Sequence, residues 1–319
     1  MSQAYAKLPR RIAVVGAGFI GTHVAAGLLR AGVETTVINR SPLSERKHRA
    51  LRGADIVVAD ATARELLRSP LMDVDHVVYC ASGLMPAESN RDPVTDVGLS
   101  LPPLLHVLNL LRGQRGAGLT YLSSGGTVYG DPKADFIDEQ HPTEPVTSYG
   151  VMKLTGEKYA LMHRRLYGIP IRILRCANVY GEDQPVTRSQ GAIAVFLDRI
   201  MRSEPVPLYG DGSIVRDFVY VGDVVDLILR SVVTAGGPVT LNVGSGEGAS
   251  LAQVINVIER LAGCRAEIDH RPDRGFDVAR VVLDITRARR DFGFTPTLLE
   301  DGIRRTLAHS RAAAEAEAP

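Results

Sequence analysis

A glycine-rich turn near the N-terminus constrains the possible folds of this chain most strongly. Residues 16–21 read Gly-Ala-Gly-Phe-Ile-Gly, follow a short apolar segment at 11–15 and precede a helical pattern at 22–31. With this spacing the first glycine permits a tight turn, the second lets the backbone approach a pyrophosphate, and the third lets the helix pack closely on the strand. The free N–H groups at the start of the helix would face the anion. The pattern therefore predicts a dinucleotide-binding loop that contacts its ligand through Gly16, Gly18, Phe19, Ile20 and Gly21.

Short apolar segments of strand length recur along the first 180 residues and alternate with helical patterns. The strand-like segments are rich in Val, Ile and Leu throughout, which is typical of strands buried on both faces. They lie at 11–15, 35–38, 55–59, 76–80, 119–123 and 171–174, and the main helical patterns lie at 22–31, 101–111 and 148–167. The alternation predicts an α/β protein with a doubly wound parallel Rossmann sheet.

The rhythm of strands and helices loosens beyond about Cys176. Pro- and Gly-rich loops at 181–188 and 205–213 appear there, with shorter helical patterns between them. Clusters of these residues mark loops rather than regular elements. We therefore expect a dinucleotide-binding domain at 1–176 and a smaller C-terminal α/β lobe at 177–319.

The composition excludes several classes of function. The chain has 37 Lys+Arg and 36 Asp+Glu and no long run of like charge, so it lacks the electrostatic footprint of a nucleic-acid or anionic membrane binder. No stretch approaches about 18 uninterrupted apolar residues, and the N-terminal segment lacks the apolar run of a signal peptide. We expect a cytoplasmic protein.

The cysteines and histidines show no spacing of metal ligands. Cys80, Cys176 and Cys264 are far apart and form no Cys-x-x-Cys pair, so we expect buried thiols rather than disulfides or a cysteine-built zinc site. The eight histidines are scattered, so we also expect no metal site.

The second predicted strand ends in Ile38-Asn39-Arg40. A carboxylate is expected near this point to bond the ribose 2′-hydroxyl of NAD, and it is missing. Asn39 can still bond a hydroxyl, whereas Arg40, with Arg46 or Lys47, could neutralise the 2′-phosphate of NADP. These residues leave the choice between NAD and NADP open.

Tyr149 and Lys153 stand four residues apart at the start of the helical pattern at 148–167. This spacing puts the phenol and the ammonium on one helix face, where they suit a proton-transfer pair. The same spacing also occurs on helix surfaces without any function. The dinucleotide loop earlier in the chain favours the catalytic interpretation.

Five segments taken together resemble the extended short-chain dehydrogenase/reductases. They are the glycine loop at 16–21, Ser-Ser-Gly-Gly-Thr-Val-Tyr-Gly at 123–130, the segments 149–153 and 175–181, and Gly-Asp-Gly-Ser-Ile-Val-Arg-Asp at 210–217. Within that superfamily the chain is most similar to the NAD-dependent sugar-nucleotide epimerases and dehydratases, the UDP-glucose 4-epimerase branch in particular. The resemblance covers nearly the whole chain. It implies that residues 217–244 return to the Rossmann domain and that a homodimer forms through the helices at 101–111 and 148–167.

The resemblance also implies which residues bind the cofactor and the substrate. Asp60 and Ala61 would contact adenine, and Ala81, Ser82 and Gly83 would line the nicotinamide side. The nucleotide sugar would be bound by Asn178, Gln190, Tyr209, Arg216, Arg274 and Asp277.

Two arginines in that set suit the two phosphates of a nucleotide sugar. Each also has acidic neighbours that could hold it in a structural ion pair instead. The candidates are Asp217 or Asp223 for Arg216, and Asp273 or Asp277 for Arg274.

By the same resemblance Tyr149 is the catalytic base, while Lys153 tunes it and bonds the nicotinamide ribose. In this family a Ser or Thr shares the substrate hydroxyl with the tyrosine, and its usual position falls here on Gly125. The role must therefore pass to Thr127, Ser124 or a water, and we favour Thr127.

Two further departures concern neighbouring positions. The sugar 4,6-dehydratases carry an Asp-Glu pair where Gly126 and Thr127 stand here, so β-elimination lacks its proton donor in this chain. Ser100 replaces an Asn that helps to order the helix ahead of the active site.

These implications favour an NAD-dependent 4-epimerase of a UDP-hexose or UDP-hexuronate that acts through a transient 4-keto intermediate. NAD is the expected cofactor, and NADP stays possible. The alternatives are a net NAD(P)-dependent oxidoreductase acting on a nucleotide sugar and a non-catalytic dinucleotide-binding regulator. No residue identifies the sugar.

Overall fold

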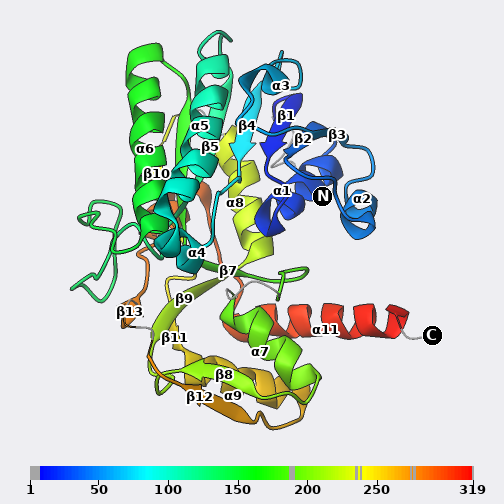
Figure 1. The fold of residues 1–319 in the computed structure, drawn as a ribbon, viewed down its shortest axis with the longest axis vertical. Coiled ribbons are helices and arrows are strands. Elements are labelled where there is room, and N and C mark those ends of the chain that lie inside the picture. The colour runs from blue at the N-terminus through cyan, green and yellow to red at the C-terminus, as the bar shows by residue number, and fades with distance from the viewer. Residues whose placement is uncertain are drawn as a thin grey trace.

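Seven parallel strands form the central sheet of the protein (Figure 1). The computed structural model describes residues 8–186, 191–233, 236–237, 239–273, 275 and 278–317. The strand order is β10-β6-β5-β4-β1-β2-β3. The bounds are β1 Arg11–Val15, β2 Glu34–Asn39, β3 Asp55–Val58, β4 His76–Tyr79, β5 Gly118–Ser124, β6 Ile171–Cys176 and β10 Thr240–Val243. The six predicted strands and the doubly wound parallel sheet are thereby confirmed.

Helices cover both faces of this sheet and bury its apolar side chains. One face carries α1 (Phe19–Arg30), α8 (Val221–Val233) and α10 (Thr286–Phe292), with α2 (Glu45–Ala50) beside α1. The other face carries α3 (Arg64–Arg68), α5 (Pro93–Leu111) and α6 (Ser148–Tyr167). The short helix α4 (Pro86–Arg91) lies at the ends of α5 and α6 that face the second lobe (Figure 1).

Helix α5 begins eight residues earlier than the periodicity predicts. The Asp92 side chain caps it by accepting a hydrogen bond from the Thr95 backbone N–H at 3.1 Å, and Pro93 occupies the first turn, where it costs no hydrogen bond. Among the described helices, α5 is long and apolar enough to cross a membrane by length and composition. Its side chains Leu104 and Leu108 are instead buried against the sheet.

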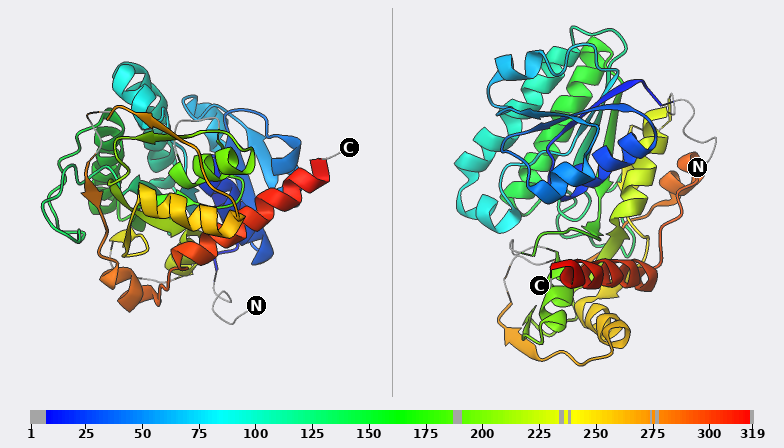
Figure 2. Two further views of the ribbon diagram at one scale, coloured as in Figure 1. Left: turned by 90° about the horizontal axis from the view of Figure 1, so that it is seen from below. Right: turned by 90° about the vertical axis from the view of Figure 1, so that its right-hand side faces the viewer.

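The second lobe lies at one end of the central sheet in Figure 1 and in the right-hand view of Figure 2. Its strands are β7 Asn178–Tyr180, β8 Val206–Tyr209, β9 Val215–Tyr220, β11 Gly248–Ser250, β12 Ile268–Arg271 and β13 Arg280–Val281. Its helices are α7 Ala192–Met201, α9 Leu251–Ala262 and α11 Leu299–Glu317. A separate apolar core, with Phe196, Leu208, Ile258 and Ile303 among its members, holds these elements together.

The chain crosses between the lobes more than once. After β9 it enters α8, which packs on α1, and then β10, which pairs in parallel with β6 at the edge of the central sheet. The chain next forms β11, α9, β12 and β13 in the second lobe and comes back to the large lobe as α10, which packs on β10. It then enters α11 of the second lobe. Segments from both halves of the sequence therefore build the large lobe.

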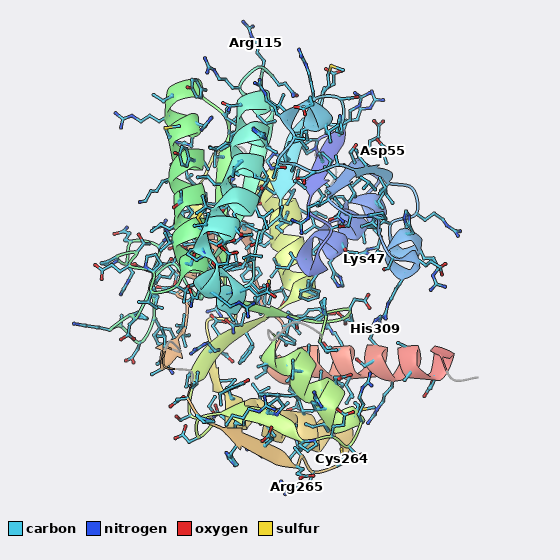
Figure 3. All side chains as sticks on the ribbon, in the orientation of Figure 1. Lys47, Asp55, Arg115, Cys264, Arg265 and His309 are labelled. Atoms are coloured by element: carbon cyan, nitrogen blue, oxygen red, sulfur yellow. The ribbon has the colours of Figure 1, made fainter. Side chains whose placement is uncertain are left out.

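The expectation that all three thiols are buried is wrong for Cys264. Cys264 is exposed because it follows Gly263, where α9 ends in a left-handed turn at the outer surface of the second lobe (Figure 3). Cys176 is buried and Cys80 is partly buried, and burial raises the pKa of each thiol to about 12. Both are therefore protonated and unreactive at neutral pH.

Candidate active site

The glycine loop lies where β1 and β4, neighbours in the sheet, run to helices on opposite faces. Gly16 has φ +96°, and a Cβ atom there would lie 2.7 Å from the Ala81 backbone nitrogen, so the β1 turn and the segment after β4 touch. A Cβ atom at Gly21 would collide with the Gly16 carbonyl oxygen, whereas one at Gly18 would meet nothing within 4 Å. The loop is thus closed on the protein side and open at the position where a pyrophosphate would approach.

The start of α1 supplies the donors for such an anion. Gly18 is the N-cap residue of this helix and offers no side-chain acceptor to its first N–H groups. Unsatisfied N–H groups and the positive end of the helix dipole form an anion site. The geometry of residues 16–21 therefore fits a dinucleotide.

Asn39 ends β2 and is bonded into this loop. Its Oδ1 accepts a hydrogen bond from the Ala17 backbone N–H at 3.0 Å, and its Nδ2 donates to the Ser41 carbonyl oxygen at 2.7 Å. Lys47 Nζ donates to the Ala17 carbonyl oxygen at 2.6 Å. The residue predicted to bond the ribose therefore also holds the phosphate loop, and a ribose contact from Asn39 stays a prediction.

The other residues expected near adenosine lie along the same edge of the sheet. Asp60, after β3, accepts hydrogen bonds from the Thr62 N–H and hydroxyl, each at 2.9 Å, and these bonds and the charge of Arg40 lower the pKa of Asp60. Arg40 is exposed. Arg46, on α2, instead forms an ion pair with Asp183. Its Nη2 also lies 2.7 Å from Nε2 of His309 on α11 (Figure 3).

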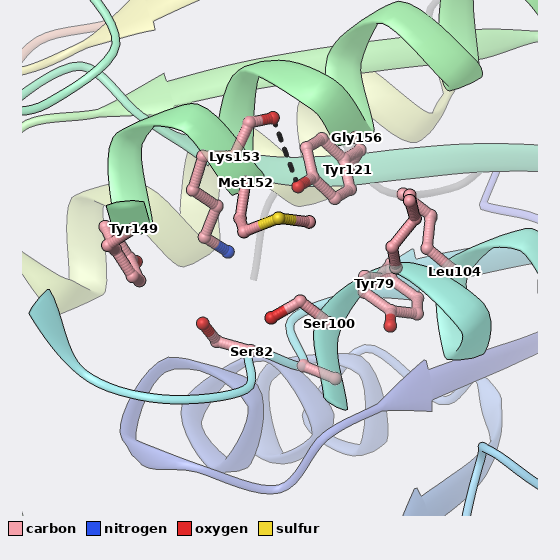
Figure 4. A pocket seen from close by; sticks show the side chains of 11 residues that line it. Tyr79, Ser82, Ser100, Leu104, Tyr121, Tyr149, Met152, Lys153 and Gly156 are labelled. Atoms are coloured by element: carbon pink, nitrogen blue, oxygen red, sulfur yellow. Dashed lines mark hydrogen bonds between the residues drawn. The ribbon is translucent and has the colours of Figure 1, made fainter. Parts of the chain in front are cut away.

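A small pocket lies between α5 and the first turns of α6, beside Tyr79 at the end of β4 and Tyr121 on β5 (Figure 4). Ser82 and Ser100 lie across the pocket from the Lys153 ammonium in this view. The lining residues are Tyr79, Ala81, Ser82, Ser100, Leu101, Leu104, Tyr121, Tyr149, Met152, Lys153 and Gly156. The structure thus brings the predicted nicotinamide side together with the predicted Tyr149 and Lys153 pair.

Tyr149 and Lys153 lie in the first turns of α6, whose start is set by Thr147. The Thr147 hydroxyl accepts a hydrogen bond from the Gly150 N–H at 3.1 Å, which caps the helix. Lys153 is only 7% exposed, donates to the Leu122 carbonyl oxygen at 3.0 Å, and places its Nζ 5.6 Å from the centroid of the Tyr149 ring. Because Lys153 is buried, little water screens its charge from the groups that line the pocket.

A buried ion pair fixes α6 on the sheet one turn beyond Lys153. Glu157, 1% exposed, accepts from Arg175 Nη2 at 2.7 Å and from the Ser123 hydroxyl at 2.5 Å. Arg175 Nη1 donates to the Tyr129 hydroxyl at 3.0 Å. The sequence reasoning missed Glu157, although its position four residues after Lys153 puts it on the same helix face.

The turn after β5 has no room for the usual family hydroxyl. A Cβ atom at Gly125 would lie 2.6 Å from Leu283 Cδ1 and 2.8 Å from the Arg175 carbonyl oxygen. One at Gly126 would lie 4.0 Å from Ser124 Oγ and 3.2 Å from Asn178 Oδ1. Gly126 therefore lies beside these two polar side chains, and a Cβ atom there would be tight against Asn178.

The two candidate hydroxyls of this turn differ in exposure. Thr127 Oγ1 is buried, with no hydrogen-bond partner among the described residues. Ser124 is partly exposed at the end of β5, and its hydroxyl has no bonding partner within the described part of the chain. Solvent access thus favours Ser124, whereas the sequence favoured Thr127.

The predicted nucleotide-sugar residues are only partly described. Arg216 Nη1, on β9, donates to the Val215 and Val278 carbonyl oxygens at 2.9 and 2.6 Å. Tyr209 is the last residue of β8, and its hydroxyl accepts a hydrogen bond from Arg271 Nη1 at 3.4 Å. The predictions on three further residues, Gln190, Arg274 and Asp277, lie outside the described residues.

The acidic neighbours of Arg216 bond to other groups. Asp217, 1% exposed, accepts hydrogen bonds from the Ser245 hydroxyl at 2.7 Å and from the Leu283 N–H at 3.2 Å. Asp223 accepts from the Thr297 hydroxyl at 2.8 Å.

Within the described ranges, no group of three or more His, Cys, Asp or Glu side chains could hold a metal ion.

Comparison with known proteins shows the family of this chain. Residues 12–244 match the profile of the NAD dependent epimerase/dehydratase family. A UDP-glucose 4-epimerase of Mycolicibacterium smegmatis is 32% identical over 308 residues, which is 93% of this chain and 97% of the relative.

Two solved structures share the fold over nearly their whole length. The UDP-glucose 4-epimerase of Thermotoga maritima, solved with UDP-glucose, has a TM-score of 0.90 at 31% identity and covers 95% of this chain and 99% of its own. The UDP-glucose 4-epimerase of Thermus thermophilus, solved in complex with NAD, has a TM-score of 0.88 at 31% identity with the same coverage.

Proposed function

Because this chain belongs to the NAD-dependent epimerase/dehydratase family, we propose that it is a 4-epimerase of a UDP-hexose or UDP-hexuronate. The observation that carries the proposal is one pocket that combines Tyr149 and Lys153 with the Ala81 and Ser82 wall after β4. A base, a cation and a nicotinamide-side wall around one small space are what oxidation of a sugar hydroxyl requires.

The fit of residues 16–21 to a dinucleotide supports NAD as the resident cofactor. Bound NAD would accept hydride from C4 of the sugar and return it to the opposite face. The chain would bind the diphosphate of the cofactor in the open space beside Gly18, at the N-terminus of α1. Asp60 and Ala61 would contact its adenine. Retaining the cofactor between the two half-reactions keeps the ketone in the site.

Tyr149 removes the proton of the sugar 4-hydroxyl and gives it back after the 4-keto sugar has turned over. The buried Lys153 ammonium places a positive charge beside the Tyr149 ring, and it would hold the nicotinamide ribose of the bound cofactor. The ion pair between Glu157 and Arg175 keeps the helix that carries both residues at a fixed height on the sheet.

Ser124 is our candidate for the hydroxyl that orients the substrate oxygen. Its partial exposure supports this assignment over Thr127, whose hydroxyl is buried. The same turn argues against dehydration, because neither position 126 nor 127 offers a carboxyl group as the acid for β-elimination.

The nucleotide and its diphosphate would bind across the second lobe. We assign Asn178 to the sugar or diphosphate, Tyr209 to the uridine and Arg216 to the diphosphate, and we keep Gln190, Arg274 and Asp277 as further contacts. Asn178 supports this arrangement, since its Oδ1 lies 3.2 Å from the position of a Cβ atom at Gly126.

A homodimer through α5 and α6 accompanies this proposal. Apolar side chains that a monomer would leave in water support it, because exposed apolar patches mark contact surfaces. They are Val94 and Val97 on α5 and Val151, Met162 and Leu166 on α6. Light scattering coupled to gel filtration would test it, and a monomer at micromolar concentration would contradict it.

Product analysis tests the function itself. The purified protein is incubated with a panel of UDP-hexoses and UDP-hexuronates without added dinucleotide, and the products are identified by chromatography and mass spectrometry. An epimerase yields a C4 epimer of unchanged mass. A product changed by about two mass units, formed only with added dinucleotide, would identify a net oxidoreductase instead.

A further inference from the structure

The segment that follows the nicotinamide-side wall is bonded to α5 through its backbone. The Gly83 N–H donates to Ser100 Oγ at 3.0 Å, and the Leu84 N–H donates to Asp96 Oδ1 at 2.9 Å. A Cβ atom at Gly83 would lie 2.5 Å from Ser100 Oγ and 2.6 Å from Asp96 Oδ1, so the backbone lies directly on these side chains. Ser100 and Asp96 therefore set the position of the wall that begins at Ser82.

Asp96 is the centre of this contact. It is 0% exposed and accepts two further hydrogen bonds, from Ser100 Oγ at 2.9 Å and from Ser89 Oγ at 2.6 Å. Its carboxylate forms no ion pair with any Lys, Arg or His in the described part of the chain. A buried carboxylate without an ion-pair partner is costly unless several hydrogen-bond donors satisfy it. The donors to Asp96 in the described structure are the Leu84 N–H and the hydroxyls of Ser89 and Ser100. A side chain that only filled space would be apolar at such a position.

The far end of the same segment is bonded to the catalytic helix. Asn90 Oδ1, in α4, accepts a hydrogen bond at 2.8 Å from the backbone N–H of Ser148, the residue before Tyr149. The N–H groups of the first turn have no partner within their own helix. Thr147 satisfies that of Gly150, and Asn90 satisfies that of Ser148.

We infer that residues 83–92 form a bracket that holds the nicotinamide-side wall and Tyr149 at a fixed separation, with Asp96 and Asn90 as its positioning residues. Asp96 and Ser100 fasten one end, and Asn90 fastens the other through Ser148. Neither positioning residue touches the reacting atoms. The inference rests on the proposed function, because the separation matters for hydride and proton transfer at one carbon.

Asn90 is the sharper test, because it is exposed and its replacement leaves no buried group unpaired. In Asn90→Ala we expect kcat to fall roughly tenfold, since sub-ångström misplacement of reacting groups has effects of this order. KM for the UDP-sugar and the amount of bound NAD should stay within about twofold of the parent. Asn90→Asp keeps an acceptor for the Ser148 N–H at the same reach and should restore kcat. Asn109→Ala, an exposed change near the other end of α5, is the matched control.

Hydrogen exchange provides a readout that needs no activity. The amides of residues 148–152 should exchange faster in Asn90→Ala and at the parental rate in Asn90→Asp and Asn109→Ala. Faster exchange in a protein that converts no sugar in the panel would support the bracket and contradict the proposed function. Unchanged exchange and unchanged kcat in Asn90→Ala, or an equal loss of kcat in Asn90→Asp, would overturn the bracket.

Asp96→Asn tests the other end. The amide retains an acceptor for the Leu84 N–H and can donate to the Ser89 hydroxyl, so the fold should be kept. A neutral amide oxygen, however, binds the Leu84 N–H more weakly than a carboxylate does. We expect faster exchange at residues 83–84 and a lower kcat with KM within about twofold. Parental exchange at those amides together with parental kcat would overturn the role of Asp96.

Discussion

Asn39 accepts a hydrogen bond from the Ala17 backbone N–H at 3.0 Å, so the amide at the end of β2 orders the glycine loop at residues 16–21. Lys47 donates to the carbonyl oxygen of the same residue at 2.6 Å. Two of the polar groups that we expect near the adenosine ribose thus bond to the loop. A third, Arg46, bridges to Asp183 of the second lobe.

This arrangement predicts that the dinucleotide released on denaturation is NAD. Of the cations that could neutralise a 2′-phosphate, Lys47 and Arg46 already bond to other groups, which leaves Arg40 at the ribose edge. Mass spectrometry of the released cofactor is the measurement. If it is NADP, Arg40 dominates, and Arg40→Ala should then weaken NADP binding while sparing NAD.

Replacing the base should separate chemistry from binding. Tyr149→Phe should lower kcat by roughly 10²-fold to 10⁴-fold, because only the proton acceptor is lost, and the amount of bound NAD should stay near that of the parent. Steady-state kinetics and cofactor extraction from the same preparation check both parts. Activity within about tenfold of the parent would refute the role of Tyr149.

The two hydroxyls of the β5 turn should respond differently to removal. Ser124→Ala should lower kcat roughly tenfold or more, because the open hydroxyl would orient the substrate oxygen. Thr127→Val removes a buried hydroxyl that has no partner in the described structure, so we expect parental activity and equal or higher thermal stability. The reverse pattern of kcat values would restore Thr127 as the catalytic hydroxyl.

Acid should destabilise the large lobe through one buried histidine. Burial, aided by the charge of Arg172, lowers the pKa of His76 to about 4, and His76 Nε2 lies 2.9 Å from Thr120 Oγ1. Because the unfolded chain binds the proton near pH ~6.5, the stability from neutral His76 is present above that pH and is lost as the pH falls toward about 4.

Urea unfolding at neutral pH and at about pH 5 measures this loss. We expect the contribution of His76 to the free energy of unfolding to fall by about 2 kcal/mol between these conditions. His76→Gln should lack this part of the decline, and His48→Gln, an exposed control, should keep it. The same pH dependence in all three proteins would remove His76 as the cause.

The central sheet could be predicted from the sequence because its signals are local. The glycine loop and the Val-, Ile- and Leu-rich segments each mark an element within a few residues, and parallel strands follow from their alternation with helices. The early start of α5 also has a local cause, the capping side chain of Asp92, but no apolar periodicity reveals it.

The fine geometry of the site could not be predicted, because it depends on contacts between distant residues. Our proposal of Ser124 over Thr127 rests on which hydroxyl the β5 turn buries, and the lack of room at Gly125 comes from Leu283 of the second half of the chain. The contact from Asn90 to Ser148 joins residues 58 positions apart. Spacing along the sequence carries no signal for such pairs.

The fate of the hydrogen at C4 tests the central claim most directly. The protein is incubated, without added dinucleotide, with the UDP-sugar it converts, carrying deuterium at C4 of the sugar. A 4-epimerase that retains its cofactor should return the deuterium to C4, so the epimer formed should have the mass of the labelled substrate and carry its label at that carbon. Loss of the deuterium to solvent, or its appearance only in a released reduced dinucleotide, would contradict the account.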